Sequence, residues 1–312
     1  MEKVRVVFMG TPEFAVPILE GLIDNYLVVG VVSQPDKRVG RKQVLVETPI
    51  KEVALQHNIK VFQPVKIRDD YEDILALNPD LIVTCAYGQI LPKSILDFPR
   101  LGCINVHASL LPKLRGGAPI HKAIIDGYSK TGVTIMYMDE LMDSGDIISQ
   151  EETEIGSDDD LESLYDRLSL IGKKLLLETL PSVIDGTNSR IKQDEDMVTY
   201  AYNIKREEEH IDFSKTSREI FNLVRGLYPV PGAYTVLDDK EMKIYTVKIS
   251  DKKCNGCICG QISNVYKNGI GVCTGDGEII ITDLRPFGKK RMSAASYING
   301  IDKSILIGKV LK

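Results

Sequence analysis

An amide and an imidazole stand two residues apart near the end of one apolar segment, and a carboxylate follows in a later turn. They belong to Asn105, His107 and Asp143. Because side chains alternate along a strand, Asn105 and His107 are expected on one face. An amide can bind an oxyanion, an imidazole can move protons and a carboxylate can orient the imidazole. Together they suit acyl transfer to an amine through a tetrahedral intermediate, with no Ser or Cys nucleophile required.

Strand-like and helical patterns alternate through the first part of the chain, up to about residue 185. Apolar runs predict strands at 4–8, 27–32, 59–62, 81–85, 103–108, 133–138 and 147–152. This alternation predicts an α/β fold with a Rossmann-like, mostly parallel sheet and helices on both faces. Thr11-Pro12-Glu13 and Thr48-Pro49 carry helix-start signals, and residues 157–160 are expected to cap a long helix.

The later part of the chain has a different pattern. Residues 186–210 are polar and turn-like, a short helix is predicted at 216–225, and short strands follow, separated by turns such as Asp238-Asp239. This spacing predicts a small antiparallel β domain. The chain is therefore divided into a first domain, 1–189, a linker, 190–208, and a second domain, 209–312.

Charge is unevenly distributed along the chain. The net charge is −5, but residues 207–312 hold 16 basic and 13 acidic side chains, a net of +3. A basic segment at 34–46, expected to be a flexible loop, contains Lys37, Arg38, Arg41 and Lys42, and a second cluster contains Lys289, Lys290 and Arg291. Both clusters are candidate phosphate contacts, and an ordinary solvated surface is the alternative reading.

Six cysteines and the absence of a signal peptide or a membrane-length apolar run predict reduced thiols in a cytoplasmic protein. Cys254, Cys257 and Cys259 form Cys-x-x-Cys-x-Cys, with Cys273 as a possible fourth ligand. Because only one ligand pair is present, loop thiols are favoured over structural zinc, and no metal is expected. The missing Gly-x-Gly-x-x-Gly disfavours NAD.

The motifs around His107 resemble those of a known enzyme family. The run from His107 to Pro112, His-Ala-Ser-Leu-Leu-Pro, with a later Asp-x-Gly, resembles the 10-formyltetrahydrofolate-dependent formyltransferases. Within that family, the longer stretch 107–120, together with 10–15 and 131–136, resembles the methionyl-tRNA formyltransferases. The resemblance runs through essentially the whole chain and implies that the tail is an OB-like β-barrel that binds tRNA.

The resemblance implies a reaction and a set of roles. Formyl would move from 10-formyltetrahydrofolate, the cosubstrate, to the α-amino group of initiator methionyl-tRNA for translation initiation. Asn105 and protonated His107 would bind the oxyanion, while Asp143 would orient His107 and take the amine proton. Folate contacts are expected from Ser109, Leu110, Leu111, Pro112, Gln89, Ile90 and Leu91, and tRNA contacts from Lys37, Arg38, Arg41, Lys42, Lys289, Lys290 and Arg291. Asp143 is preferred over Asp139, Glu140 and Asp146 because it precedes the Ser-Gly pair.

Three alternatives remain open from the residues. The acceptor could be a small amine, such as glycinamide ribonucleotide or a sugar nucleotide, or it could be water, as in a folate hydrolase. The chain could also be a noncatalytic RNA-binding module. The basic 34–46 segment and the β tail argue against a small acceptor, and the intact Asn105, His107 and Asp143 argue against the noncatalytic reading. A monomer without membrane contact is expected.

Overall fold

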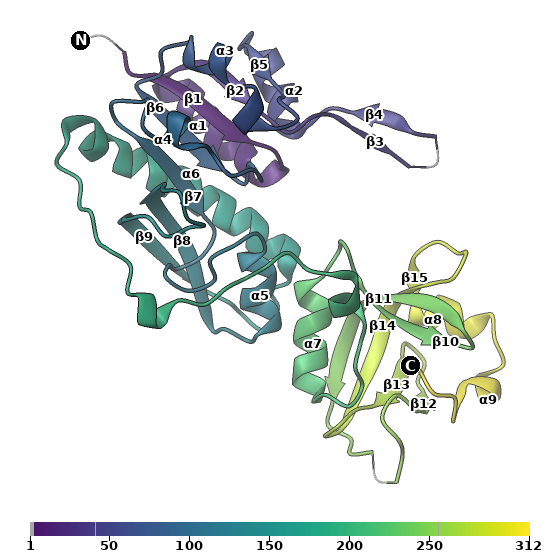
Figure 1. The fold of residues 1–312 in the computed structure, drawn as a ribbon. Helices are drawn as coiled ribbons and strands as arrows, with labels where there is room; N and C mark the ends of the chain where they lie inside the picture. The colour runs from purple at the N-terminus through teal and green to yellow at the C-terminus, as the bar shows by residue number, and fades with distance from the viewer. Residues whose placement is uncertain (1–2, 41, 255) are drawn as a thin grey trace. The chain divides into compact units, whose positions relative to one another are not determined.

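The computed structural model describes residues 3–40, 42–254 and 256–312 (Figure 1). Contacts divide the chain into a first unit, Met1–Pro119, Lys130–Glu154 and Tyr165–Tyr202, and a second unit, Ile120–Ser129, Ile155–Leu164 and Asn203–Lys312. Residues 190–202, expected in the linker, therefore belong to the first unit by their contacts. The domain boundaries at 189 and 209 stay a prediction.

The first unit is built on a seven-stranded sheet in the order β5-β2-β1-β6-β7-β8-β9. Its strands are β1 (Arg5–Gly10), β2 (Leu27–Val32), β5 (Val61–Phe62), β6 (Leu81–Cys85), β7 (Cys103–His107), β8 (Lys130–Tyr137) and β9 (Ile147–Glu154). The five strands from β5 to β7 are parallel, while β8 runs antiparallel to both of its neighbours. All five residues of β6 are buried, as expected for a parallel strand covered on both faces. The predicted Rossmann-like sheet is confirmed.

Helices cover both faces of this sheet. They are α1 (Val16–Asn25), α2 (Pro49–Gln56), α3 (Glu72–Leu75), α4 (Lys93–Leu96) and the long α6 (Leu161–Asp185), with 3-10 turns at Glu13–Ala15, Ile67–Asp69 and Glu195–Met197. On one face, Gly172 of α6 lies against Val106 of β7 and Ile18 of α1. On the other, Ile95 of α4 packs in a core cluster with Cys103 of β7. Val106 and Cys103 of β7 therefore face the helices on opposite sides of the sheet.

Of the helix starts predicted at Thr48-Pro49 and at Thr11-Pro12-Glu13, the first is confirmed and the second is wrong. Thr48 caps α2, its hydroxyl accepting a hydrogen bond from the Lys51 amide at 3.3 Å, with Pro49 at the first turn. The helix expected at Thr11-Pro12-Glu13 begins later, with a 3-10 turn and then α1 from Val16. The Thr11 hydroxyl donates to the Tyr87 carbonyl at 3.2 Å, so it serves a tertiary contact instead of a cap.

The segment 34–46, predicted as a flexible loop, contains a β-hairpin. β3 (Lys37–Val39) pairs antiparallel with β4 (Val44–Val46), and the hairpin projects from the sheet of the first unit (Figure 1). Gly40 at φ +72° and Gln43 at φ +50° support the reversal. The loop prediction was wrong because three-residue strands interleaved with cations give almost no alternating apolar pattern.

The second unit contains a six-stranded antiparallel sheet with the main order β10-β11-β14-β13-β12. Its strands are β10 (Ala233–Leu237), β11 (Lys240–Ser250), β12 (Ile262–Val265), β13 (Ile270–Cys273), β14 (Glu278–Pro286) and β15 (Met292–Ser293). Its helices are α5 (Pro119–Ile125), most of which lies in this unit, with α7 (Ser217–Gly226), α8 (Ala294–Asn299), α9 (Lys303–Leu306) and a 3-10 turn at Arg206–Glu209. Ile220 and Val224 of α7 join a buried cluster with Ile244 and Ile279 of the sheet.

The last residues connect the two edge strands of this sheet. Lys312 and Val236 of β10 exchange main-chain hydrogen bonds at 2.8 and 3.0 Å. On the other edge, Ile262 of β12 donates to the Lys309 carbonyl at 2.8 Å, and Leu311 donates to the Gly260 carbonyl at 2.8 Å. The tail thus bridges β10 and β12, which gives the antiparallel sheet its OB-like arrangement.

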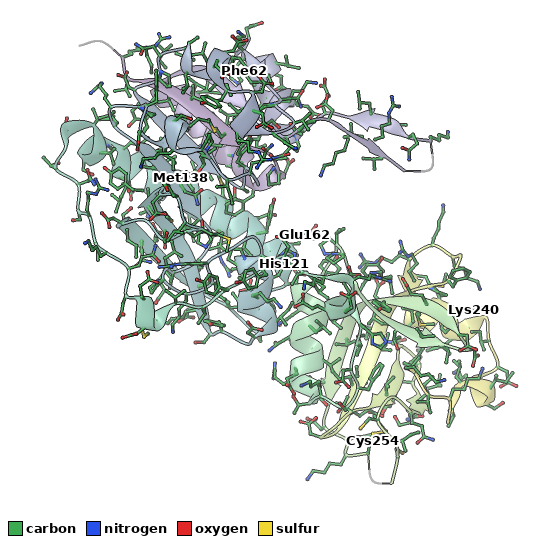
Figure 2. The ribbon with its side chains drawn as sticks, in the orientation of Figure 1. Phe62, His121, Met138, Glu162, Lys240 and Cys254 are labelled. Carbon is green, nitrogen blue, oxygen red and sulfur yellow. A yellow bond between two sulfur atoms is a disulfide. The ribbon has the colours of Figure 1, made fainter. Side chains whose placement is uncertain are left out.

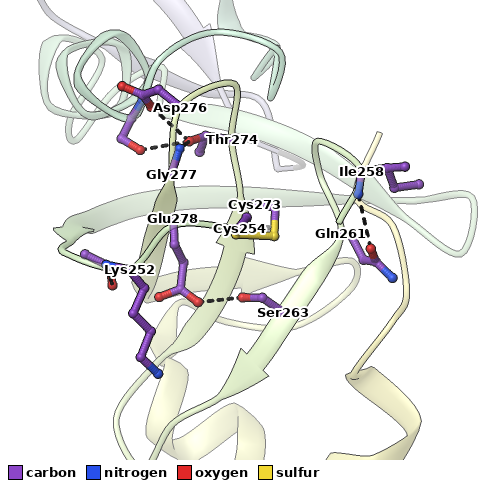
Figure 3. The surroundings of a disulfide bond; sticks show 12 residues. Lys252, Cys254, Ile258, Gln261, Ser263, Cys273, Thr274, Asp276, Gly277 and Glu278 are labelled. Carbon is purple, nitrogen blue, oxygen red and sulfur yellow. Dashed lines mark hydrogen bonds between the residues drawn. A yellow bond between two sulfur atoms is a disulfide. The ribbon is translucent and has the colours of Figure 1, made fainter. Parts of the chain in front are cut away.

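The prediction that all six cysteines are reduced is wrong for two of them. Cys254 and Cys273 form a disulfide with their Cα atoms 5.6 Å apart, within the usual range (Figure 3). Cys254 follows β11 and Cys273 ends β13, a meeting set by sheet topology that the sequence spacing does not reveal. Across the described residues, His, Cys, Asp and Glu form no group of three or more that could hold a metal ion.

No helix in the described ranges is long and apolar enough to cross a bilayer.

We expect two thiols of the folded protein, those of Cys257 and Cys259, to react rapidly with a disulfide reagent. Both are exposed, while Cys85 and Cys103 are buried, and burial raises the pKa of the Cys103 thiol to about 12. Titration should give two equivalents in the native protein, four after denaturation and six after reduction. A rapid third equivalent from the native protein would contradict the burial of Cys85 and Cys103.

Candidate active site

Asn105 lies on β7 with its side-chain amide oriented by the neighbouring strand. The Thr84 hydroxyl of β6 donates to Asn105 Oδ1 at 2.8 Å, and the Met138 sulfur lies 3.2 Å from the same hydroxyl. Met138, which follows β8, is labelled in Figure 2. Because Oδ1 is the acceptor, the other end of the amide, Nδ2, carries two hydrogens that it can donate elsewhere. The local geometry therefore presents Asn105 as a hydrogen-bond donor.

His107 ends the same strand and is 5% exposed. Its Nε2 lies 3.0 Å from the Leu114 carbonyl oxygen. A carbonyl can only accept, so Nε2 carries the hydrogen and Nδ1 is left to face another group. Asp143 Oδ2 lies 3.7 Å from Nδ1. That distance is too long for a hydrogen bond, so the contact becomes an ion pair when the ring is protonated.

Asp143 reaches the site from the turn between β8 and β9. Its Oδ2 accepts a hydrogen bond from the Gly116 amide at 2.8 Å. Gly116 has φ +122°, and a Cβ there would lie 2.7 Å from the Ala201 carbonyl, so only glycine fits this approach. Asp143 itself has φ +51°, a left-handed conformation that is uncommon for residues other than glycine. The structure thus brings Asp143 to within 3.7 Å of His107.

The other acids of this turn are engaged elsewhere. Asp139 Oδ1 accepts from the Leu141 amide at 3.0 Å, which makes it a turn-forming carboxylate. Glu140 forms an ion pair with Lys93 at 2.9 Å. Asp146 pairs with Arg190 at 3.0 Å. Each of these three carboxylates thus has a partner other than His107.

The segment that follows His107 is a turn held by its own hydrogen bonds. The Ser109 hydroxyl donates to the Lys113 carbonyl at 2.7 Å, and the Leu111 amide donates to Thr134 Oγ1 at 3.1 Å. Ser109 and Leu111 are buried, whereas the other two predicted folate contacts here, Leu110 and Pro112, are partly exposed. Leu110 and Pro112 are therefore the better placed side chains for contact with a ligand.

The second predicted folate segment follows β6. Gln89 Oε1 accepts from the Ile67 amide at 2.8 Å, and Gln89 Nε2 donates to the Pro64 carbonyl at 3.3 Å. Leu91 is 3% exposed and belongs to the core, while Ile90 is 79% exposed. Gln89 thus fixes the segment against its neighbour, and Ile90 presents an apolar side chain to solvent.

The hairpin cations Lys37, Arg38 and Lys42 are exposed, and Arg41 lies outside the described residues. Asp36 anchors the base of the hairpin: its Oδ1 accepts from Gln63 Nε2 at 2.7 Å and its Oδ2 from Lys51 Nζ at 2.5 Å. The hydrogen bond from Gln63 and then that from Lys51 lower the pKa of Asp36. The exposed cations therefore lie on a hairpin whose base is held to the rest of the first unit by hydrogen bonds to Asp36.

The tail cluster is less uniform than its sequence suggests. Lys289 and Lys290 are exposed. Arg291 binds the Asp283 carboxylate with Nε at 2.9 Å, and its guanidinium lies 4.4 Å from the ring centre of Tyr245. The hydrogen bond to Asp283 raises the pKa of Arg291. Arg291 is exposed like the two lysines, but its guanidinium is held by a structural partner within the protein.

Sequence reasoning missed three residues that support this site. Thr84 orients Asn105, while Gln193 and Arg115 hold the Asp143 turn through contacts described below. Arg115 lies in the stretch that carries the family resemblance, which is the one available signal. Gln193 lies in a polar segment expected to be a linker, where no local pattern marks it.

Two family models match the chain: Formyl transferase over residues 2–180, and Formyl transferase, C-terminal domain, over residues 203–302. A relative from Bacillus subtilis named methionyl-tRNA formyltransferase is 53% identical over 300 residues, covering 95% of this chain and 94% of the relative. A relative of the same name from Staphylococcus epidermidis is 49% identical over 311 residues, covering 98% and 99%.

A solved structure shares the fold. The N-formyltransferase from Helicobacter canadensis, in complex with folinic acid and dTDP-3-aminofucose, superposes with a TM-score of 0.66. It is 21% identical, and the match covers 91% of this chain and 100% of that chain. At this identity the likeness concerns the fold.

Proposed function

The chain belongs to the methionyl-tRNA formyltransferase family, and from this premise we propose that Asn105, His107 and Asp143 catalyse its reaction. The reaction transfers a formyl group to the α-amino group of methionine on initiator methionyl-tRNA. The observation that carries the proposal is the approach of Asp143 Oδ2 to His107 Nδ1, 3.7 Å apart at the end of β7. This approach brings a carboxylate that can accept a proton to a protonatable ring, on the strand that also carries the Asn105 amide.

The formyl donor is a folate, 10-formyltetrahydrofolate. Folinic acid, also a folate, is bound by the Helicobacter canadensis relative. The residues present fit such a group: Ile90 and Leu110 offer apolar side chains that can cover a ring, and main-chain groups beside them can pair with its polar edge. When bound, the folate supplies the formyl carbon as the electrophile. Gln89, Leu91, Ser109, Leu111 and Pro112 complete the proposed folate segment.

Asn105 and His107 stabilise the negative charge that develops on the formyl oxygen as the amine attacks. The Asn105 donor is Nδ2, because Oδ1 is held by Thr84. The His107 donor is Nδ1–H of the protonated ring, because Nε2–H is held by the Leu114 carbonyl. Both donors are fixed before the reaction by residues of the sheet and its following turn, which is the condition for efficient oxyanion stabilisation.

Asp143 takes the proton that the attacking amine loses. Its Oδ2 already accepts from the Gly116 amide, so the carboxylate is oriented before substrate arrives. The new carbon–nitrogen bond forms at methionine, the old one to the folate nitrogen breaks, and that nitrogen gains a proton, so the proton count balances. The same carboxylate lies 3.7 Å from His107 Nδ1 and forms an ion pair with the ring when the ring is protonated.

The tRNA contacts come from the hairpin cations Lys37, Arg38, Arg41 and Lys42 and from the tail cations Lys289, Lys290 and Arg291. We expect replacement of Lys37 and Lys42 by Ala to raise the KM for methionyl-tRNA and to flatten its dependence on salt. Each lost phosphate contact should reduce the slope of log KM against log salt by about 1.

Replacement of Lys130 and Lys174 by Ala is the matched control, because it also removes two exposed cations from the first unit, each paired with a glutamate. The control should keep the wild-type salt slope. Equal slopes for the hairpin variant and the wild-type protein would remove the hairpin from the tRNA contacts.

The test of the proposed function is single-turnover transfer of labelled formyl from 10-formyltetrahydrofolate. The acceptors are charged initiator methionyl-tRNA, uncharged tRNA, glycinamide ribonucleotide and water alone. Label on the charged tRNA only is expected. Label on the small amine, or free formate without an acceptor, would favour the small-amine or hydrolase alternatives and overturn the tRNA assignment.

A further inference from the structure

Residues 191–201, here called the strap, run along the first unit and contact both segments that carry the catalytic side chains. Ile191 exchanges main-chain hydrogen bonds with Ile147, at 2.8 and 2.9 Å. Further along, the Arg115 amide donates to the Thr199 carbonyl at 2.9 Å, and the Ala201 amide donates to the Arg115 carbonyl at 2.7 Å. The strap is therefore bonded to the start of β9 at one end and to the turn after β7 at the other.

Gln193 of the strap holds the turn that carries Asp143. Its Nε2 donates to the Asp143 carbonyl at 2.8 Å and to the Gly145 carbonyl at 2.9 Å. Both hydrogens of the amide are thus used on one turn. Asp143 has φ +51° and a Cβ at Gly145 would lie 2.0 Å from the Tyr137 carbonyl, so the turn is tight and sits in an uncommon conformation. Gln193 supplies contacts that favour that conformation.

Arg115 connects Gln193 to His107. Its guanidinium Nε donates to Gln193 Oε1 at 3.0 Å, and its terminal nitrogens bind the Glu195 carboxylate at 2.9 and 3.4 Å. Arg115 is 3% exposed, so its orientation is fixed. The residues on either side of Arg115 bind the two catalytic side chains: the Leu114 carbonyl accepts a hydrogen bond from His107, and the Gly116 amide donates one to Asp143.

These contacts form a closed circuit through both catalytic groups. Both paths from His107 to Asp143 begin at the Leu114 carbonyl. One continues through the Arg115 side chain and Gln193, and the other follows the main chain to the Gly116 amide. We propose that Gln193, held by Arg115, is a positioning residue that sets the distance between Asp143 and His107 and thereby the rate of formyl transfer. The proposal rests on the function proposed above for Asp143. Hydrogen-bonded networks that fix a reacting group in this way act on the chemical step more than on binding.

The test is Gln193→Met, which keeps the length of the side chain and removes both donors. We expect kcat to fall about 10- to 100-fold while the KM values for methionyl-tRNA and for the folate stay within about twofold, since a 1 Å displacement of a reacting group costs on that order. A rise in both KM values with unchanged kcat would overturn the proposal, because it would place Gln193 in substrate binding.

Two control variants separate positioning from general damage. Asp194→Ala removes the hydrogen bond from the Asp196 amide next to Gln193 without touching the Asp143 turn. Thr216→Ala removes the cap of α7 in the second unit and lowers stability there. Both should keep wild-type kcat. A loss in these variants equal to that of Gln193→Met would mean that kcat reports stability alone, which would overturn the proposal.

A double-mutant cycle tests whether Gln193 acts through Asp143. In the Asp143→Asn background, Gln193→Met should cause little further loss of kcat, because the group that it positions is already gone. Independent, multiplicative losses would contradict the proposal. Full activity of Asp143→Asn by itself would instead defeat the proposed function, so the two failures are distinguishable.

Discussion

Asp143→Asn is expected to lower single-turnover formyl transfer by about 10²- to 10⁴-fold, the usual contribution of a positioned acid–base group. The amide cannot take the amine proton, and it cannot form the ion pair with His107 across 3.7 Å. Asparagine keeps the size of the side chain and can still accept from the Gly116 amide, so the turn should persist. Folate binding, measured by fluorescence or calorimetry, should therefore be retained.

Asp146→Asn is the matched control for this experiment. Asp146 lies three residues away in the same turn, but its carboxylate pairs with Arg190 at 3.0 Å and not with His107. Its loss should cost an exposed ion pair, about 1 kcal/mol of stability or less, and leave the rate within about threefold. Near-normal transfer by Asp143→Asn would remove Asp143 from the mechanism, and an equal loss in both variants would assign the effect to the turn as a whole.

Asn105→Ala is expected to lower kcat by about 10²- to 10³-fold, the usual cost of removing one oxyanion donor. The effect should fall on kcat, with the KM for methionyl-tRNA unchanged. The hydrogen bond from the Asn105 amide to the formyl oxygen is strongest in the transition state, when negative charge develops on that oxygen. Steady-state and single-turnover kinetics measure the two parameters separately.

Thr84→Val provides a graded comparison for Asn105→Ala. It removes the hydroxyl that donates to Asn105 Oδ1 at 2.8 Å but leaves the amide in place. A smaller loss, about 10-fold, is expected because the amide is no longer held in one orientation. If Asn105→Ala changed KM and left kcat intact, Asn105 would be a binding residue and the oxyanion role would be wrong.

The first sheet was predictable because its strands obey simple rules. β6 is a continuous buried run, Leu81–Cys85, which a parallel strand covered on both faces requires. Alternation along β7 correctly placed Asn105 and His107 on one face, opposite Val106, which packs against α6. Thr48-Pro49 marked the start of α2 because a cap and a proline at the first turn act locally.

The features that escaped prediction depend on contacts between distant residues. Gln193 lies 50 residues from Asp143 in the sequence, and nothing around Gln193 indicates that it holds that turn. The Cys254–Cys273 disulfide depends on where β13 ends beside the segment after β11. Thr11 had the chemistry of a helix cap, but its hydroxyl donates to Tyr87. In each case contacts between residues far apart in the sequence, and not the local sequence, determine the structure that forms.

The second unit is assembled from three separate parts of the chain, and this limits how the protein can be recombined. Helix α7 contacts both of the other segments. Gly226 packs so closely on Ile125 that a Cβ at Gly226 would lie 2.7 Å from that side chain. Arg225 donates hydrogen bonds to the carbonyls of Gly156 and Asp159 at 2.8 and 2.9 Å. A chimera joined at residue 203 would carry α7 without the native partners that residues 120–129 and 155–164 provide. The second unit therefore cannot be exchanged by a single crossover, and grafts between relatives must bring all three segments together.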